Sequence, residues 1–392
     1  MQSDSANLSA AAHWRRLTPL FVCTAAWGLV TVMLGPLLPA LTARWHIQDA
    51  QAGSLFTASF LGQLAGAWFA ARNLRLSLLL GAALSAAGTA ALAWSSFSAA
   101  HVALFAAGLG LSAGLTAGNI VAGTSAAPYR ARTLTLFNVG WSIGAIACPA
   151  LVHLCGASNT RLFFLVTTAI VTLCGLFAAT LPRLLTEASP AVAASTQSRI
   201  PLQPLPLALF AVSMLLYIGN ENSLGGWLPT FAVRNQSVLH ASTIALLYWL
   251  SELLSRLLMA GFLPRVSEAV LYRASLVLLI ATQAALLIVP HPGAALVVSA
   301  TLLSGAAIGP LYPLLIAFLL ARTGNHPRLG RLFASSSLGG ATLPWFTGIL
   351  STHFGALRAG LLVPAAGVTL MLLLSSSILP GRQSRATSSL SE

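Results

Sequence analysis

Lysine is absent from this chain of 392 residues, and only seven residues are acidic. Charged residues make up 7% of the total, far below the ~25% typical of a soluble domain. Without lysine the chain cannot contain a phosphate-binding loop of the G-x-x-x-x-G-K type, which excludes nucleotide hydrolysis by that motif. The four cysteines fall in or at the end of apolar segments and have no disulfide or metal-ligand spacing: Cys23, Cys148, Cys155 and Cys174.

Apolar residues dominate instead, at 57% of the chain with a mean hydropathy of +0.83. A hydrocarbon core of ~30 Å needs ~20 apolar residues in a helix. The runs are continuous rather than alternating, which excludes the strands of a membrane barrel. The sequence therefore predicts an all-α membrane protein with twelve transmembrane helices, near residues 17–41, 50–71, 76–95, 99–125, 133–155, 160–181, 204–233, 240–263, 269–290, 294–320, 329–352 and 356–379.

All 20 basic residues are arginines, and most of them lie at the ends of the apolar runs. If the N-terminus is cytoplasmic, 15 arginines face the cytoplasm, only Arg44, Arg161, Arg234 and Arg358 face the opposite side, and Arg256 lies within a helix. This asymmetry follows the positive-inside rule and predicts that both termini are cytoplasmic, in a bacterial-type inner (plasma) membrane. The formal charge of +13 is thus an orientation signal and does not indicate a nucleic-acid partner.

Two pairs of motifs recur at nearly the same offset. The segment 35–39 (GPLLP), followed by Arg44, resembles 225–229 (GGWLP), followed by Arg234. The segment 142–144 (SIG) with Pro149 resembles 337–339 (SLG) with Pro344. We therefore expect two six-helix bundles related by pseudo-twofold symmetry, spanning residues 1–181 and 204–392 and joined by a cytoplasmic linker at 182–203. Such halves place a substrate site at their interface, near the middle of the membrane.

Three charged residues lie inside the predicted spans away from their ends, where their cost makes a functional role the default interpretation: Glu221, Glu252 and Arg256. Glu252 and Arg256 are four residues apart, so they can pair on one helix face, which would keep Glu252 charged. Glu221 is the first candidate for a substrate or proton site and Glu252 the second. A structural hydrogen-bonding role remains an alternative for each of the three.

Aromatic and amide side chains accumulate in the spans that also carry glycine and proline. Flat apolar rings beside amides suit a neutral sugar, which needs a stacking surface and hydrogen-bond partners for its hydroxyls. Packing alone is the alternative for any single ring. The predicted substrate site consists of Trp27, Asn119, Asn138, Trp141, Glu221, Asn222, Trp249, Tyr312 and Trp345.

The chain resembles the major facilitator superfamily and, within it, the fucose-permease-like group of sugar–proton symporters. The resemblance rests on 217–221 (YIGNE) leading to 225–228 (GGWL), on 309–313 (GPLYP) and on 339–345 (GGATLPW). Two features depart from the pattern. Span one has no carboxylate of the kind that takes up the proton in that group, and the loop around Arg72 and Arg75 lacks the usual acidic partner.

The resemblance implies secondary active transport of a small polar solute, a sugar by preference, by alternating access and with protons as the candidate coupling ion. It also implies a monomer. Proline kinks a helix, and kinks in paired helices suit a protein whose two halves rock against each other. The candidates for a gating or structural role are Arg72, Arg75, Arg256, Pro149 and Pro344.

Efflux of amphipathic or drug-like compounds on the same fold is the alternative function. We expect no enzyme activity, because the eight histidines lie in loops or near span ends and no nucleophile–base or metal constellation appears. Neither a metal nor a cofactor is expected.

Overall fold

The described chain is helical, as its continuous apolar runs predict. A computed structural model describes residues 2–70, 73–124, 127–156, 158–182, 204–236, 238–262, 265–323 and 329–379. The first part of the chain forms α1 (Gln2–Val32), α2 (Leu34–Trp45), α3 (Asp49–Ala70), α4 (Leu74–Leu92), α5 (Phe97–Gly123), α6 (Ala127–Cys155) and α7 (Thr160–Ala178). The second part forms α10 (Pro204–Asn235), α11 (Ala241–Phe262), α12 (Glu268–Ile288), α13 (Ala294–Ile308), α14 (Leu311–Thr323), α15 (Leu329–Phe354), α16 (Leu357–Gly360) and α17 (Leu362–Ile378).

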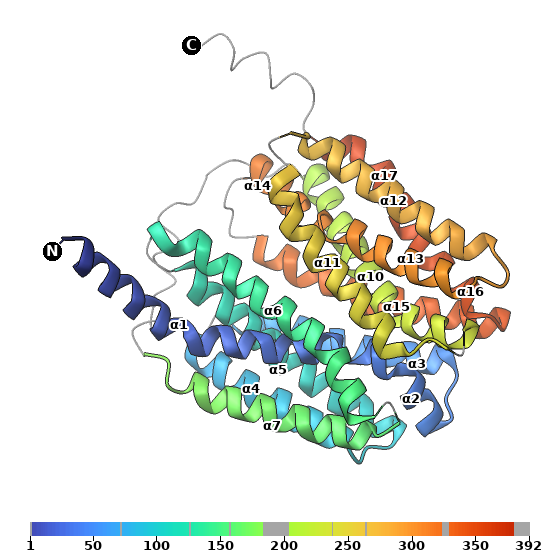
Figure 1. Cartoon of the computed structure of the whole chain (residues 1–392), viewed down its shortest axis with the longest axis horizontal. Coiled ribbons are helices and arrows are strands. Elements are labelled where there is room, and N and C mark those ends of the chain that lie inside the picture. The colour runs from blue at the N-terminus through green and yellow to red at the C-terminus, as the bar shows by residue number, and fades with distance from the viewer. Residues whose placement is uncertain are drawn as a thin grey trace, which may run out of the picture.

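These helices form two bundles, the first of α1–α7 and the second of α10–α17 (Figure 1). The expected twelve spans are α1 with α2, α3, α4, α5, α6, α7, α10, α11, α12, α13 with α14, α15, and α16 with α17. The bundles join mainly where α3 packs on α15, α2 on α10, and α6 on α11. The predicted linker lies almost wholly outside the described residues.

Close helix crossings repeat the predicted internal symmetry. In the first half, a Cβ atom on Gly144 of α6 would overlap the carbonyl oxygen of Ala25 in α1. In the second half, a Cβ atom on Gly339 of α15 would overlap the carbonyl oxygen of Leu215 in α10. Gly339 follows Gly144 by 195 residues, and Leu215 follows Ala25 by 190 residues. The repeated sequence motifs have the same two offsets, so equivalent helices pack alike in both halves.

The axis that relates the halves passes close to Gly35 and Gly225. A Cβ atom on Gly35 of α2 would overlap the carbonyl oxygen of Gly225 in α10. These two glycines hold the same place in the first pair of repeated motifs. Equivalent residues of two related bodies can touch each other only near their symmetry axis, so this contact marks its position.

Helix length and apolarity alone identify eight membrane spans in the described chain, and the bent pair α1–α2 makes nine. The three spans outside that set are α3, α11 and α15. All three lie at the junction between the halves, where protein rather than lipid covers part of each helix. Their lower apolarity therefore follows from their position.

Prolines explain two breaks in the spans. The helix axis bends by 44° between α1 and α2. Pro36 lies just after the break, and in an unbroken helix its ring would clash with the carbonyl of Val32, four residues earlier. A second break separates α13 from α14 at Gly309 and Pro310. There, Pro313 offers no N–H to the carbonyl of Gly309, four residues earlier.

Candidate functional site

A cluster of buried ionisable side chains lies inside the second half. Glu221 of α10 and Glu252 of α11 have side chains that are 10% and 2% exposed. Arg256, one turn after Glu252, forms ion pairs with both carboxylates, and its Nη2 atom lies 3.2 Å from Oε1 of Glu221. The pairing of Glu252 with Arg256 expected from their spacing is confirmed. Two carboxylates thus share one guanidinium group.

The helix break in span ten gives Arg256 its third contact. Its Nε atom donates to the carbonyl oxygen of Gly309 at 3.2 Å. That carbonyl lacks an intrahelical donor because Pro313 has no N–H, so the arginine satisfies a backbone group that the break leaves open. The cationic side chain is therefore held by the backbone at the break between α13 and α14 as well as by the two acids.

Three tyrosines surround the acids. The hydroxyl of Tyr217 donates to the Glu221 carboxylate and lies 3.1 Å from Nη2 of Arg256. The hydroxyl of Tyr248 donates to the backbone carbonyl of Glu221 at 3.2 Å. The ring of Tyr312 packs on that of Tyr217, with centroids 5.4 Å apart. This shell excludes lipid from the charges and supplies donors to Glu221.

A tryptophan pair joins this cluster to the first half. Trp141 of α6 meets Trp249 of α11 edge to face, with ring centroids 5.9 Å apart at 84°. The Nε1 atom of Trp141 donates to the hydroxyl of Thr31 at 3.3 Å. Trp249 packs on Tyr248 in turn, and its own Nε1 atom is buried and has no hydrogen-bond partner among the residues that the structure describes. An unpaired buried donor is costly, so this N–H is available to a bound polar molecule.

Charged contacts between the halves lie at the end of the bundle where α10 ends and α3 begins. Arg234 of α10 makes two hydrogen bonds of 2.6 Å to the carboxylate of Asp49 in α3. The hydroxyl of Ser351 in α15 donates to the same carboxylate at 2.5 Å. Close by, the hydroxyl of Thr352 accepts from the backbone N–H of Ala50 at 2.8 Å. We refer to Asp49, Arg234 and Ser351 as the outer contact.

Of the nine predicted substrate residues, the structure brings Glu221, Trp249, Tyr312 and Trp141 into one continuous set of contacts. Asn222 is next to Glu221 in sequence, but its amide N–H donates to the carbonyl of Ile218 in its own helix.

The other four lie apart from this set. Trp27 packs inside the first half, where a Cβ atom on Gly114 would meet its ring. Asn119 and Asn138 are exposed and donate to carbonyls of their own helices, at 3.1 and 2.9 Å. Trp345 is 37% exposed and packs on Phe346, which is also exposed.

The candidate gating residues take separate roles. Arg75 donates to the carbonyl oxygens of Leu181 and Ala179, beyond the end of α7, at 2.9 Å each. Pro149 and Pro344 lie inside α6 and α15, and the carbonyl of Pro344 accepts from Trp227 Nε1 at 2.9 Å. Arg72 lies outside the described residues.

Sequence reasoning left out two tyrosines of the central cluster and the ion pair between the halves. Tyr217 precedes Glu221 by one helical turn, so spacing could have found it; Tyr248 adjoins Trp249 in sequence but reaches Glu221 only across α10 and α11. No sequence signal joins Asp49 to Arg234, 185 residues away.

In the described part of the chain, no group of three or more histidine, cysteine, aspartate or glutamate side chains could hold a metal ion.

Two helical bundles, the second of which holds a buried charged cluster that the Trp141–Trp249 contact links to the first, have the architecture of a secondary membrane transporter. The family model for the Major Facilitator Superfamily matches residues 20–328, so the chain belongs to this superfamily. No curated protein matches the chain significantly in sequence.

Solved structures resemble it over nearly the whole length. The nucleoside transporter NupG is 16% identical with a TM-score of 0.70, over 94% of this chain and 99% of that one. The E. coli fucose:proton symporter FucP is 15% identical with a TM-score of 0.60, over 93% of this chain and 98% of that one. A D-xylose–proton symporter is 14% identical with a TM-score of 0.71, over 92% of this chain and 97% of that one.

Proposed function

We propose that this transporter carries a small polar solute, a sugar by preference, between its two halves, and that proton movement drives it. The buried cluster of Glu221, Glu252 and Arg256 beside the Trp141–Trp249 pair is the observation that supports this proposal best. The tryptophan rings offer a surface for the C–H face of a sugar, and the unpaired Nε1 of Trp249 offers a donor for a hydroxyl. Similarity in fold to two sugar–proton symporters agrees with this choice.

Charge balance supports a single coupling proton. Two carboxylates and one guanidinium group leave the cluster one negative charge in excess, and a net charge inside a membrane protein is costly. One proton makes the cluster neutral. Glu221 is the preferred carrier because its side chain is 10% exposed against 2% for Glu252, so it is nearer to exchange with water. Glu252 is the second candidate.

Alternating access requires each end of the molecule to close in turn. The outer contact and the Phe56–Trp227 ring pair hold the halves together at one end in this conformation. With both termini cytoplasmic, as the arginine distribution predicts, that end faces outward and the conformation faces inward. The protein then works in a bacterial-type inner membrane, as a monomer and without enzymatic chemistry.

The coupling proposal is tested with Glu221→Gln in proteoliposomes. Glutamine keeps the size and hydrogen bonding of the side chain but cannot exchange a proton, so we expect uptake driven by an imposed pH gradient to be abolished. Glu268→Gln is the matched control, because Glu268 is an exposed acid at the start of α12. Unchanged pH-driven accumulation in Glu221→Gln would rule out this carrier.

The substrate class is tested by thermal shift on purified protein with monosaccharides, nucleosides, amino acids and drugs. A ligand at a hundred times its Kd stabilises the folded state by about 2.7 kcal/mol, so even millimolar binders register. The stabilising sugar should lose affinity in Trp249→Phe, which keeps a ring and removes the free N–H. Stabilisation by none of the sugars would contradict the preferred substrate.

Efflux of amphipathic cations is the second candidate function, because the excess negative charge and the aromatic shell also suit a lipophilic cation. Tryptophan quenching by such cations, with no response to sugars, would favour this function over the first.

A further inference from the structure

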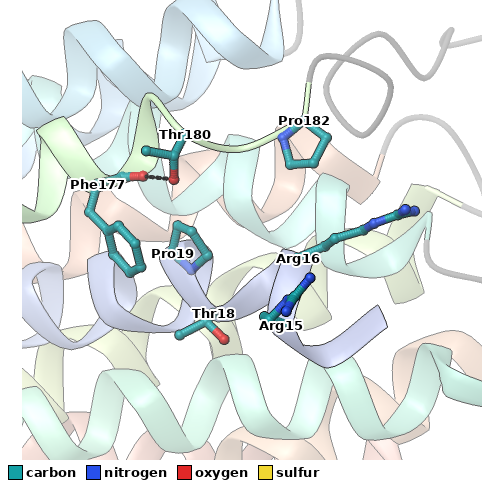
Figure 2. Close-up of a pocket in the computed structure, with 7 residues that line it drawn as sticks. All are labelled: Arg15, Arg16, Thr18, Pro19, Phe177, Thr180 and Pro182. Carbon is teal, nitrogen blue, oxygen red and sulfur yellow. Dashed lines mark hydrogen bonds between the residues drawn. The ribbon is translucent and has the colours of Figure 1, made fainter. Parts of the chain in front are cut away.

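A cavity distant from the central cluster lies where α1 enters the bundle and α7 leaves it. Its volume is about 310 Å³. Arg15 and Arg16 lie at one end, and Pro19 and Phe177 at the other (Figure 2). Thr18 and Thr180 contribute hydroxyl groups to the walls. The cavity therefore combines two cations with an apolar floor.

Among the residues that the structure describes, neither arginine has a hydrogen bond or an ion pair with another side chain. The acidic side chains that the structure describes are Asp49, Glu221, Glu252 and Glu268, and each lies elsewhere in the fold. The carbonyl oxygens beyond the end of α7 already accept from Arg75. Both arginines are exposed, so their charge is available to an anion from outside the chain.

The position of the cavity matches the headgroup layer of a membrane. The apolar part of span one begins at Leu17, directly after the two arginines, and α7 ends at Ala178. Headgroups of phospholipids lie at the level where a span changes from apolar to charged residues. A basic pocket between spans at this level suits an anionic lipid headgroup.

An apolar surface continues from the cavity toward the middle of the membrane. On α7, Leu173, Leu176 and Phe177 are 65%, 65% and 41% exposed and lie on one face of the helix. On α1, Val22 is 39% exposed, one turn beyond Thr18. This surface provides a place for acyl chains below the headgroup, which a free phosphate ion would not need.

We infer that the cavity of Arg15 and Arg16 is a binding site for an anionic phospholipid, with the phosphate on the arginines and the acyl chains along α7. Phosphate oxygens accept hydrogen bonds from guanidinium groups in a bidentate geometry. The lipid would fix the inner ends of α1 and α7 relative to each other. This site is independent of the substrate and of the coupling ion.

The test uses the full chain in mild detergent and titrates it with phosphatidylglycerol, with phosphatidylcholine as the neutral lipid. Native mass spectrometry counts bound lipid, and a thermal shift reports its effect on stability. We expect saturable binding of phosphatidylglycerol and a loss of about fivefold in affinity for each of Arg15→Gln and Arg16→Gln. Arg265→Gln removes one exposed cation from a different helix end and should leave the affinity unchanged.

A second variant tests the cavity without changing charge. Thr180→Phe fills the cavity from the turn after α7 and keeps both arginines, so binding should weaken although the charges that orient the chain remain. Equal binding of the two lipids, an equal loss in Arg265→Gln, or unchanged binding in all cavity variants would overturn the inference.

Two competing occupants give distinct results. Inorganic phosphate that blocks phosphatidylglycerol at millimolar concentration would indicate a free-anion site, and the lipid assignment would be wrong. Lipid binding that appears only in Glu187→Gln would indicate that the Glu187 carboxylate, and not a lipid, neutralises the two arginines in the parent protein, which also contradicts the assignment.

Discussion

At the residue scale, Arg256 decides the character of the central site. It contacts both Glu221 and Glu252 and satisfies the carbonyl of Gly309. A buried charge is tolerated only when it is paired and hydrogen-bonded. Removal of this one side chain would leave two uncompensated carboxylates and an open backbone carbonyl, so the stability of the second half depends on it.

We expect Arg256→Gln to destabilise the protein by about 3–5 kcal/mol, the usual cost of breaking a buried ion pair from one side. The double variant Glu252→Gln/Arg256→Gln should recover a large part of that loss because it also removes one unpaired charge. Thermal unfolding of both variants in detergent measures the difference. Equal instability of the single and double variants would show that the ion pair with Glu252 contributes little.

At the element scale, glycine allows the spans to cross at backbone contact. Gly144 brings α6 against α1, and Gly339 brings α15 against α10 at the equivalent crossing. In lipid, helices associate through close packing rather than through a hydrophobic driving force, so such crossings hold a bundle together. The repeated pair of crossings also makes the two halves alike.

The substitution Gly144→Ala tests this packing against Gly123→Ala. Alanine is ordinarily better than glycine within a helix by ~1 kcal/mol. At Gly144 its Cβ atom would meet the carbonyl of Ala25, so we expect a net loss of about 1–3 kcal/mol from overpacking. At Gly123 a Cβ atom meets nothing within 4 Å, so that variant should be unchanged or slightly more stable. Thermal unfolding by intrinsic fluorescence compares the two, and equal melting temperatures would contradict the packing argument.

At the scale of the whole molecule, the outer contact links α3 of one half to α10 and α15 of the other. Asp49 is 8% exposed and accepts from both Arg234 and Ser351. A transporter that alternates must break this contact in each cycle, so it contributes to the balance between the two end states. The outer contact can stabilise this end state only moderately, because a large stabilisation would hold the protein in one of its two conformations.

We expect Asp49→Asn to open this end more often. Loss of a charge-assisted contact of about 1.4 kcal/mol changes the ratio of two conformations tenfold. The readout is the rate at which an impermeant thiol reagent labels Thr57→Cys, a position whose hydroxyl reaches Ala341 across the junction. Arg358→Gln, at the same end but outside the outer contact, is the control. Labelling no faster than in the parent would mean that the contact does not hold this end closed.

Composition, the length of the apolar runs and the repeated motifs were enough to predict the membrane class, the helical architecture and the duplication. The sequence also indicated that Glu252 and Arg256 pair, since their spacing is local to one helix. The folded structure was needed to show that Glu221 shares Arg256, that Trp141 contacts Trp249, and that Asp49 joins the halves. It also separated Trp27, Asn119, Asn138 and Trp345 from the cluster, because the direction of a side chain depends on how its helix is rotated against its neighbours. Periodicity within one helix carries that information only weakly in a chain where nearly every face is apolar.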